Sequence, residues 1–425
     1  MTSSGRSSKV FSSPTFPTRR IGRIAKMHRH QLTPSELAVG PVMHYSIPAV
    51  QRFGKGVIED GASIDSNKLE IQRRCVLISR LNPRKSTLCI AEPATQRTIA
   101  STEFVPLETG SLADDAFLLH ALSTNGVTAF LEANSESATR SHQRVEPKAI
   151  LKIKIPWPST ETRAAIVEFL RHEVREIDAV IEDFSSSIEL TEEAVSAAVH
   201  EKLRSQTSDI VSSRLKTVAR IESGSGFPHH EQGHANEELP FFKVGNLKEA
   251  AGGFLESSQN SISRSTARKL GAVTFEPGAV IMAKIGAAMR LNRNAILVRP
   301  SCIDNNMLGL TCGPDLLPEF LSNLLSDLDI APYISPGAIP SLDIAAFRAI
   351  RLPLPSMPEQ ARLVDLISSV RTNASKSIND LDRAITLAKE RRAALITAAV
   401  TGQIDVTAKR RPAAEQLEDD IKELP

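Results

Sequence analysis

The sequence predicts an α+β protein built from two mixed, mostly β domains, each followed by one long α-helix. Three observations predict this class: an internal duplication, short apolar runs bounded by turn residues, and two stretches in which apolar residues repeat every seven positions. The chain has 425 residues, 41% hydrophobic and 24% charged, which are ordinary values for a chain that buries its own cores. At about 150 residues per domain, this length allows two or three domains.

The duplication is clearest where the long helices are expected to begin. IPWPSTETRAAIVEFL from Ile155 aligns without a gap with LPLPSMPEQARLVDLI from Leu352, an offset of 197 residues. Just upstream, RSHQRV from Arg140 lies over GAIPSL from Gly337, again at 197. These matches join the end of each predicted domain to the start of its helix.

Two further matches lie earlier in each copy. CVLISRLN from Cys75 shares its apolar pattern with AVIMAKIG from Ala279, at an offset of 204 residues. STEFVPL from Ser101 lies over DNNMLGL from Asp304, at an offset of 203. Four matches in one order and at nearly one offset predict two copies of a unit of roughly 200 residues.

Each copy has a front part and a back part. In the front part, runs such as CVLISRL, AVIMAKI and NAILVRP are bounded by Gly, Pro, Ser and Asn, which predicts short strands. The back part is announced by Pro-x-Pro-Ser, and Ser159 and Ser356 lie where a helix N-cap is expected. The back part is therefore predicted to be a long helix.

Both predicted helices carry an apolar stripe with steps of three and four residues, which is the pattern of a coiled-coil seam. In the first helix the stripe contains Val167, Leu170, Val174, Ile177, Ile181, Phe184 and Ile188. In the second helix it contains Val364, Ile367, Ile378, Leu381, Ile385 and Leu395. We expect the two stripes to pair; the alternative is that each helix packs on its own domain. Arg371 and Arg392 interrupt the second stripe without an evident reason.

These patterns divide the chain into seven segments. The basic N-terminal segment, for which disorder is one reading, is 1–35; the first domain is 36–157, its helix 158–203, the linker 204–213, the second domain 214–355, its helix 356–401 and the tail 402–425. The first helix is rich in Asp and Glu, so it is expected to repel phosphates and to be a solvated face or a dock for a protein partner.

Positive charge gathers in equivalent places of the two front parts, although the whole chain carries a net charge of only +2. This segregation indicates a polyanion as partner, with ordinary surface charge as the alternative. Arg and Lys suit phosphates, whereas Asn, Gln and Arg can also bind base edges. The candidate DNA-binding residues are Asn67, Lys68, Arg80, Asn82, Arg84, Lys85, Arg140, His142, Gln143, Arg144, Lys243, Asn246, Lys269, Lys284, Arg290, Arg293, Asn305 and Asn306.

Other classes of protein find little support. No apolar run reaches the roughly 18 residues of a membrane helix, the N-terminus lacks the apolar core of a secretory signal, and the four cysteines form no disulfide framework, so a reducing cytoplasm is expected. There is no GxxxxGK[ST] loop and no Asn-Pro-Pro-aromatic methyltransferase motif. His230-Glu231-Gln232-Gly233-His234 matches the HExxH signature of zinc peptidases, but Pro228 and Gly233 indicate a loop. A zinc hydrolase is therefore a remote alternative, and no catalytic or metal-binding residue is assigned.

Taken in order and in duplicate, the motifs resemble the specificity (S) subunit of type I restriction–modification enzymes, from about Tyr45 to Val406. The most specific part is GAIPSLDIAAFRAIRLPLPSMPEQARLV followed by LAKERRAALITAAVTGQIDV. FFKVGNL, DNNMLGL, SNKLEI, SRLNPR, STEF and SHQRV are similar to the family as well. The first copy departs from the pattern, because Ser159-Thr160-Glu161-Thr162 replaces the more typical Met357-Pro358-Glu359-Gln360, and TGQID is absent after the first helix.

The resemblance implies a function and a set of partners. Each front part would be a target recognition domain that reads one half of a bipartite, asymmetric site in double-stranded DNA, and the helices would form an antiparallel coiled coil with pseudo-two-fold symmetry. Two modification (methyltransferase) subunits and the restriction subunits would bind this scaffold. S-adenosylmethionine, ATP and Mg would belong to those partners, so the chain itself would hold no cofactor and would not catalyse. An S-like subunit of a modification-only or orphan system is the alternative.

Overall fold

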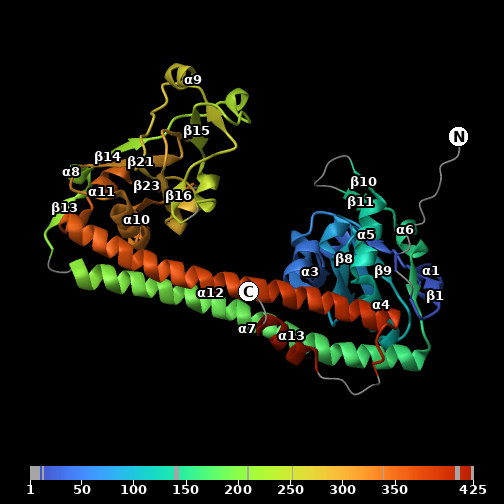
Figure 1. Ribbon diagram of the computed structural model, residues 1–425. Coiled ribbons are helices and arrows are strands. Elements are labelled where there is room, and N and C mark those ends of the chain that lie inside the picture. Colours follow the sequence, from blue (N-terminus) through green and yellow to red (C-terminus); the bar gives the residue numbers. More distant parts are fainter. Residues whose placement is uncertain are drawn as a thin grey trace. The chain divides into compact units, whose positions relative to one another are not determined.

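The computed structural model describes residues 10–11, 14–137, 143–207, 210–250, 252–337, 339–406 and 412–422. The chain divides into two compact units, unit 1 with Met1–Ser186 and Leu381–Pro425, and unit 2 with Ser187–Asp380. The expected mixture of helices and short strands is confirmed. The two long helices are α7 (Thr160–Thr207) and α12 (Met357–Thr401), and each contributes residues to both units (Figure 1).

Unit 1 contains a five-stranded sheet of order β2-β5-β8-β3-β4 and a three-stranded sheet of order β7-β6-β9. Its strands are β1 (Thr18–Arg20), β2 (Gln31–Leu32), β3 (Pro41–Tyr45), β4 (Val57–Asp60), β5 (Lys68–Glu70), β6 (Cys75–Ser79), β7 (Leu88–Ala91), β8 (Arg97–Ser101), β9 (Phe104–Leu107), β10 (Ser135–Ser137), β11 (Gln143–Val145) and β12 (Lys154–Pro156). Its shorter helices are α1 (Ile21–Ile24), α2 (Pro34–Leu37), α3 (Ile47–Phe53), α4 (Leu112–Leu122), α5 (Asn125–Ala133), α6 (Pro147–Lys152) and α13 (Ala413–Lys422).

Unit 2 contains a five-stranded sheet of order β14-β21-β18-β19-β16 and a three-stranded sheet of order β17-β15-β20. Its strands are β13 (Ser212–Arg214), β14 (Ala219–Ser223), β15 (Leu239–Phe242), β16 (Phe254–Leu255), β17 (Ser261–Ile262), β18 (Val280–Ala283), β19 (Asn294–Leu297), β20 (Cys302–Ile303), β21 (Met307–Cys312), β22 (Ile334–Ser335), β23 (Ser341–Leu342) and β24 (Arg351–Pro353). Its shorter helices are α8 (Leu215–Val218), α9 (Arg264–Lys269), α10 (Pro318–Asp327) and α11 (Ile344–Arg348).

The two units repeat one strand arrangement. In unit 1, β6 pairs antiparallel with β9 so that Val76 lies opposite Leu107. In unit 2, β18 pairs antiparallel with β21 so that Val280 lies opposite Leu310. These positions differ by 204 residues on one strand and 203 on the other, the same offsets that relate the sequence motifs. The repeated register therefore agrees with the predicted duplication.

The N-terminal segment differs from its expected description. Residues 18–20 form β1, which pairs antiparallel with β12 just before α7 begins. In unit 2, β13 pairs antiparallel with β24 just before α12 begins. Between Thr18 and the end of the segment at 35, the chain therefore forms strands and short helices. Strand β1 has a counterpart that the sequence comparison missed because only three residues carry it.

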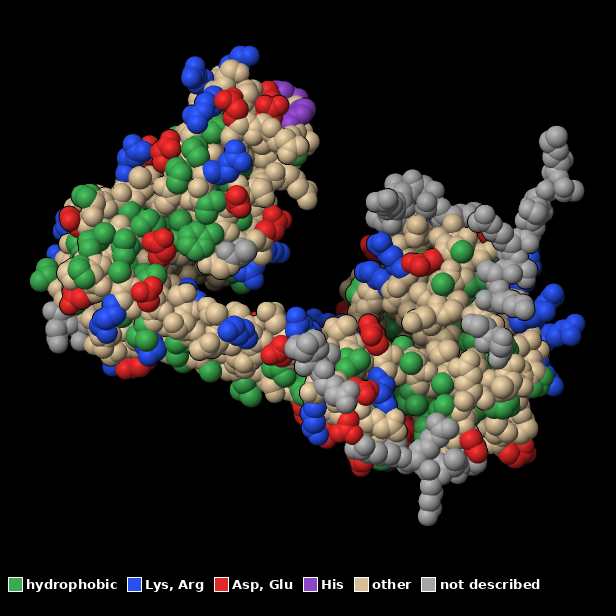
Figure 2. Space-filling model, in the orientation of Figure 1, with side chains coloured by type: hydrophobic (Ala, Val, Ile, Leu, Met, Phe, Trp, Pro, Cys, Tyr) green, Lys and Arg blue, Asp and Glu red, His purple; other side chains and the backbone are tan. Residues whose placement is uncertain are grey.

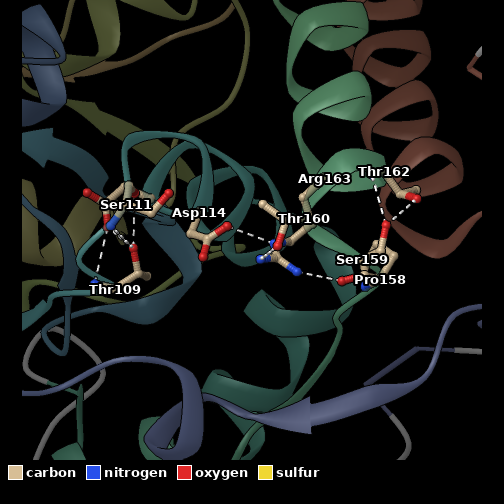
Figure 3. A network of polar contacts seen from close by, with 9 residues as sticks. Thr109, Ser111, Asp114, Pro158, Ser159, Thr160, Thr162 and Arg163 are labelled. Carbon is tan, nitrogen blue, oxygen red and sulfur yellow. Dashed lines mark hydrogen bonds and ion pairs between the residues drawn. The ribbon is translucent and has the colours of Figure 1, made fainter.

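A buried polar side chain fastens the first turn of each long helix to its own domain. In unit 1, Arg163 Nε donates to Asp114 Oδ1 at 2.8 Å and Nη1 donates to the Pro158 carbonyl at 2.5 Å (Figure 3). The guanidinium also lies 4.3 Å from the centre of the Trp157 ring. Only 6% of Arg163 is exposed. Removing either partner of such a pair would leave the other charge unpaired in a mostly buried place, so the pair ties the helix start to α4.

Unit 2 uses a neutral residue at the equivalent position, 197 residues later. Gln360 is fully buried, its Nε2 donates to the carbonyls of Pro355 and Asp315 at 2.9 and 2.8 Å, and its Oε1 accepts from the Leu317 amide. Both side chains bind the carbonyl of the second proline in Pro-x-Pro-Ser. Arg163 and Gln360 differ chemically, but both hold the first turn of a long helix against the chain segment that precedes it.

The apolar stripes are the less exposed faces of the long helices. Besides facing the other helix, they pack against the globular domains at the helix ends. Leu170, Val174, Ile177, Ile367 and Ile385 are buried, and the remaining predicted members are partly buried. At the helix ends the deepest residues lie one position from the predicted ones, because there the helices also pack on the globular domains. Ile166 of α7 and Ile396 of α12 are buried in the core of unit 1, beside Val167 and Leu395, and Leu363 of α12 is buried in the core of unit 2, beside Val364. No helix in the described ranges combines the length and hydropathy that crossing a bilayer requires.

Contacts between the two helices occur within each unit. In unit 1, Ile177 of α7 and Ala388 of α12 share one buried cluster. In unit 2, Leu203 of α7 shares a cluster with Leu363 of α12, and Arg362 donates to Gln206 at 2.6 Å.

The two arginines that interrupt the second stripe have defined partners. Arg392 Nε donates to Asp178 Oδ1 of α7 at 2.8 Å, within unit 1. Arg371 Nη1 donates to Asn323 Oδ1 of α10 at 2.5 Å, within unit 2, and burial lowers the pKa of Arg371. Both arginines therefore fix a long helix to a neighbouring helix.

Candidate nucleic-acid interface

Three loops of unit 1 meet at one place and bring together several of the predicted DNA-binding residues. The Arg80 amide donates to the Glu103 carbonyl at 2.9 Å, the Val145 amide to the Arg80 carbonyl at 2.9 Å, and the Asn82 amide to the Gln143 carbonyl at 2.8 Å. These bonds join the loop after β6, the turn between β8 and β9, and strand β11. We call this arrangement the loop junction of unit 1.

Unit 2 has the same junction, bond for bond. The Lys284 amide donates to the Asn306 carbonyl at 2.9 Å, and the Leu342 amide donates to the Lys284 carbonyl at 2.9 Å. The Gly286 amide donates to the Pro340 carbonyl at 2.8 Å. The offsets from unit 1 are 204 for the first loop, 203 for the turn and 197 for the third segment, so Arg80 and Lys284 occupy equivalent positions.

The side chains of the unit 1 junction gather around one carboxylate. Glu103 accepts Arg144 Nε at 3.1 Å and lies 3.3 Å from Arg80 Nε. One carboxylate thus holds two guanidinium groups at the surface, and the cluster keeps a net positive charge. Glu103 was not foreseen from the sequence; the signal was its alignment with Asn306, a predicted base-reading residue.

The side chains of the unit 2 junction are less charged. Lys284 Nζ donates to Ser223 Oγ at 2.8 Å. Burial lowers the pKa of this ammonium group, and the charge of Asp304 opposes that shift. Asn305 is exposed, whereas the Asn306 amide donates to Asp304 Oδ1 at 2.7 Å. The two junctions therefore share a backbone but present different polar groups.

Exposed basic side chains lie beside each junction. In unit 1, Arg84 and Lys85 lie on a short 3₁₀ turn, Pro83–Lys85, which begins after Asn82 and ends before Ser86. Both flanking residues have left-handed backbone angles, with φ of 48° for Asn82 and 43° for Ser86, a conformation that is uncommon outside glycine. Both cations are open to solvent.

In unit 2 the exposed basic side chains are spread more widely. Arg290 lies on the 3₁₀ turn that follows Gly286, and Arg293 lies just before β19. A second group covers α9, where Figure 2 shows Lys and Arg side chains together; it contains Arg264, Arg268 and Lys269.

Other predicted residues have structural partners. Lys243 Nζ donates to Gln232 Oε1 at 2.6 Å and lies 5.1 Å from the centre of the Phe227 ring. Asn246 caps its own turn, accepting from the Lys243 amide at 2.8 Å and donating to Glu249 at 2.9 Å. Both side chains are committed to contacts inside unit 2.

The predicted neighbours Asn67 and Lys68 differ in their exposure to solvent. Asn67 is exposed, but Lys68 is buried and its Nζ donates to the carbonyl and the hydroxyl of Ser66 at 3.0 and 2.7 Å. Burial lowers the pKa of Lys68. Its role in this conformation is to close a loop, which corrects the expectation of a surface contact. Arg140 and His142 lie outside the described residues.

The HEQGH stretch lacks the helical geometry of a zinc peptidase. His229–Glu231 form one 3₁₀ turn, and the chain then continues without helix through His234. The Gln232 side-chain amide donates to the Phe227 carbonyl through Nε2 and accepts from Lys243 Nζ through Oε1. The stretch is therefore a loop that supports Lys243, and it gives the zinc-hydrolase reading no support.

Three thiols that are buried or half-buried are poor nucleophiles. Burial raises the pKa of Cys75, Cys89 and Cys312 to about 12, so each is protonated near neutral pH. Burial, with a smaller contribution from the Arg392 charge, lowers the pKa of His120 to about 4.

Comparison with known proteins gives a relation at the level of fold. No family model and no curated protein matches the sequence. A chain from a structure described as the basis of complex assembly and conformational transition of the type I R-M system is similar over 93% of this chain and 100% of its own, with a TM-score of 0.67 and 18% identity. Two further structures are similar over most of both chains. One is the HsdS subunit from Thermoanaerobacter tengcongensis, with a TM-score of 0.44, 18% identity, and coverage of 92% of this chain and 98% of its own. The other is the type I S subunit from M. genitalium, with a TM-score of 0.37, 13% identity, and coverage of 91% of this chain and 96% of its own. The resemblance expected from the sequence is thus confirmed for the fold.

Proposed function

We propose that this chain, which shares the fold of a type I restriction–modification chain, is the DNA sequence-specificity subunit of such a system. The observation that carries the proposal is the loop junction, which occurs twice with the same three backbone hydrogen bonds and with different side chains. A repeated scaffold with different polar groups suits the recognition of two different half-sites in one bipartite site. The two front parts are then the target recognition domains.

The charges around the junctions support this proposal. Arg84 and Lys85 would contact phosphates and set the register, whereas Asn82, Gln143 and Arg144 offer groups that can bind base edges. In unit 2, Asn305 and Arg290 would have the corresponding roles. The acidic face of α7 would stay away from the duplex.

The long helices would complete the function by fixing the gap between the half-sites. We propose that α7 and α12 pair as an antiparallel coiled coil and relate the two domains by a pseudo-two-fold axis. Two modification subunits and the restriction subunits would assemble on this scaffold. These subunits would supply S-adenosylmethionine, ATP and Mg.

Removing Arg84 and Lys85 together should weaken DNA binding and flatten its salt dependence. If each contacts one phosphate, the slope of log K against log salt should fall in magnitude by roughly 1.8, at about 0.9 per phosphate. Fluorescence anisotropy of a labelled duplex, measured with the modification subunit present, reports this slope.

The matched control is Arg171→Ala with Arg175→Ala on the acidic helix α7, where both side chains are exposed. That pair should leave the slope unchanged. An unchanged slope for Arg84→Ala with Lys85→Ala would contradict phosphate contact at the unit 1 junction.

Shortening both long helices should change the gap and leave the half-site bases as they are. Deleting seven residues from each helix, 183–189 and 379–385, removes two turns or about 10.5 Å, which is about three base pairs of duplex. Sequencing of methylated adenines in a host that carries the variant measures the gap. Altered half-site letters with an unchanged gap would contradict the role of the helices as a spacer.

A further inference from the structure

The C-terminal helix α13 fills an apolar groove on the long helices of unit 1. Leu417 at its centre is fully buried and shares a cluster with Ile177 of α7 and Ala388 of α12. Arg391 of α12 donates to both Asp420 and Gln416 of α13, which fixes the direction of the helix. One apolar anchor and one charged clamp thus hold α13 in place.

Unit 2 carries the same groove, and there it is open. A hollow of about 370 Å³ on α7 and α12 is lined by Leu190, Thr191, Ala194, Val195, Val370 and Ala374. Leu190 is 64% exposed, a large value for a leucine on the apolar side of a helix pair. The side chains that line this hollow are almost all apolar or small.

The duplication shows that the two grooves are equivalent. Adding 197 to Leu190 and Thr191 gives Leu387 and Ala388, both in the cluster around Leu417. Subtracting 197 from Ala374 gives Ile177, which is in that cluster too. The open groove of unit 2 is therefore the site that α13 covers in unit 1.

The grooves differ in charge at one position. Arg391, which holds the acidic α13, corresponds to Ala194 in unit 2. A second copy of α13 would lose its charged clamp there. The open groove instead fits an amphipathic helix with a leucine-sized side chain at its centre and no acidic pair beside it, carried by a partner subunit.

We propose that the unit 2 groove binds a helix of the modification subunit, and that α13 is an intramolecular competitor for the equivalent groove of unit 1. This inference rests on the proposed function, which supplies two copies of that partner. The first copy binds the open groove directly. The second copy binds only after α13 has left, so its apparent affinity is lowered by the fraction of molecules in which the groove is closed.

The test measures the two binding steps separately, by native mass spectrometry of the full chain titrated with the modification subunit. In the unaltered chain the second step should be weaker than the first by roughly tenfold or more, the effect expected for displacing a buried leucine. Leu417→Asp, or a chain ending at Pro412, should bring the two steps close to equality. Glu418→Ala, an exposed change on the same helix, should leave their ratio unchanged.

Two further results decide the proposal. Leu190→Glu should weaken the first step, and amide hydrogen exchange of α13 should rise when the second copy binds. Two equal steps in the unaltered chain, with no effect of removing α13, would overturn this inference and leave the proposed function intact. If no variant binds the modification subunit at all, the proposed function fails and this inference fails with it.

Discussion

Arg163→Ala should lower the stability of unit 1 by about 3 kcal/mol, because it leaves Asp114 without its partner in a mostly buried site. It also frees the Pro158 carbonyl and removes the cation that lies over Trp157. Trp157 is the only tryptophan of the chain and belongs to unit 1, so its fluorescence during urea unfolding follows this unit selectively.

The control is Arg171→Ala, on the same helix and exposed, which should leave the Trp157 transition where it is. Arg163→Gln should cost less than Arg163→Ala, since Gln360 binds the equivalent proline carbonyl in unit 2. If the alanine variant unfolds at the same urea concentration as the unaltered chain, the buried pair does not fasten the helix.

Gly402→Ala should destabilise unit 1 by about 2–4 kcal/mol. Gly402 follows the last residue of α12 with a φ of +77°, where a side chain costs about 1 kcal/mol or more. A Cβ there would also lie 2.1 Å from Thr15 Oγ1 and 2.7 Å from the Phe16 ring, and such overpacking costs about 1–3 kcal/mol. Urea unfolding followed at Trp157 measures the loss.

Gly54 offers a matched comparison for this variant. It follows α3 with a φ of +67°, and an added Cβ would meet nothing within 4 Å. Gly54→Ala should therefore show the backbone strain alone, and the difference between the two variants isolates the contact of the N-terminal segment with the end of α12. Equal losses would contradict the importance of that contact.

The features that could be predicted from the sequence are those that depend on periodicity or repetition. The stripe through Leu170, Val174 and Ile177 predicts a buried helix face because each member recurs at helical spacing. The offsets of the four motifs predict the repeated sheet register. The convergence of Arg80, Asn82 and Gln143 was partly accessible, because their counterparts recur in the second copy at the same offsets.

The features that could not be predicted depend on pairing between distant side chains. Lys68 was expected at the surface, yet its ammonium group closes a loop, and no local pattern distinguishes the two states. Glu103 accepts both guanidinium groups of the unit 1 junction, and its only signal in the sequence was its alignment with Asn306. Strand β1 is too short to give a repeat signal, so its role was visible only in its pairing with β12.

We propose that one chain reads two different stretches of duplex through two copies of one loop junction. Random duplexes can be selected by the chain bound to the modification subunit and then sequenced. We expect two distinct short motifs separated by a fixed number of unspecified base pairs, with Asn82→Ala and Gln143→Ala relaxing only one of them. A single continuous motif, or no enrichment at all, would contradict it.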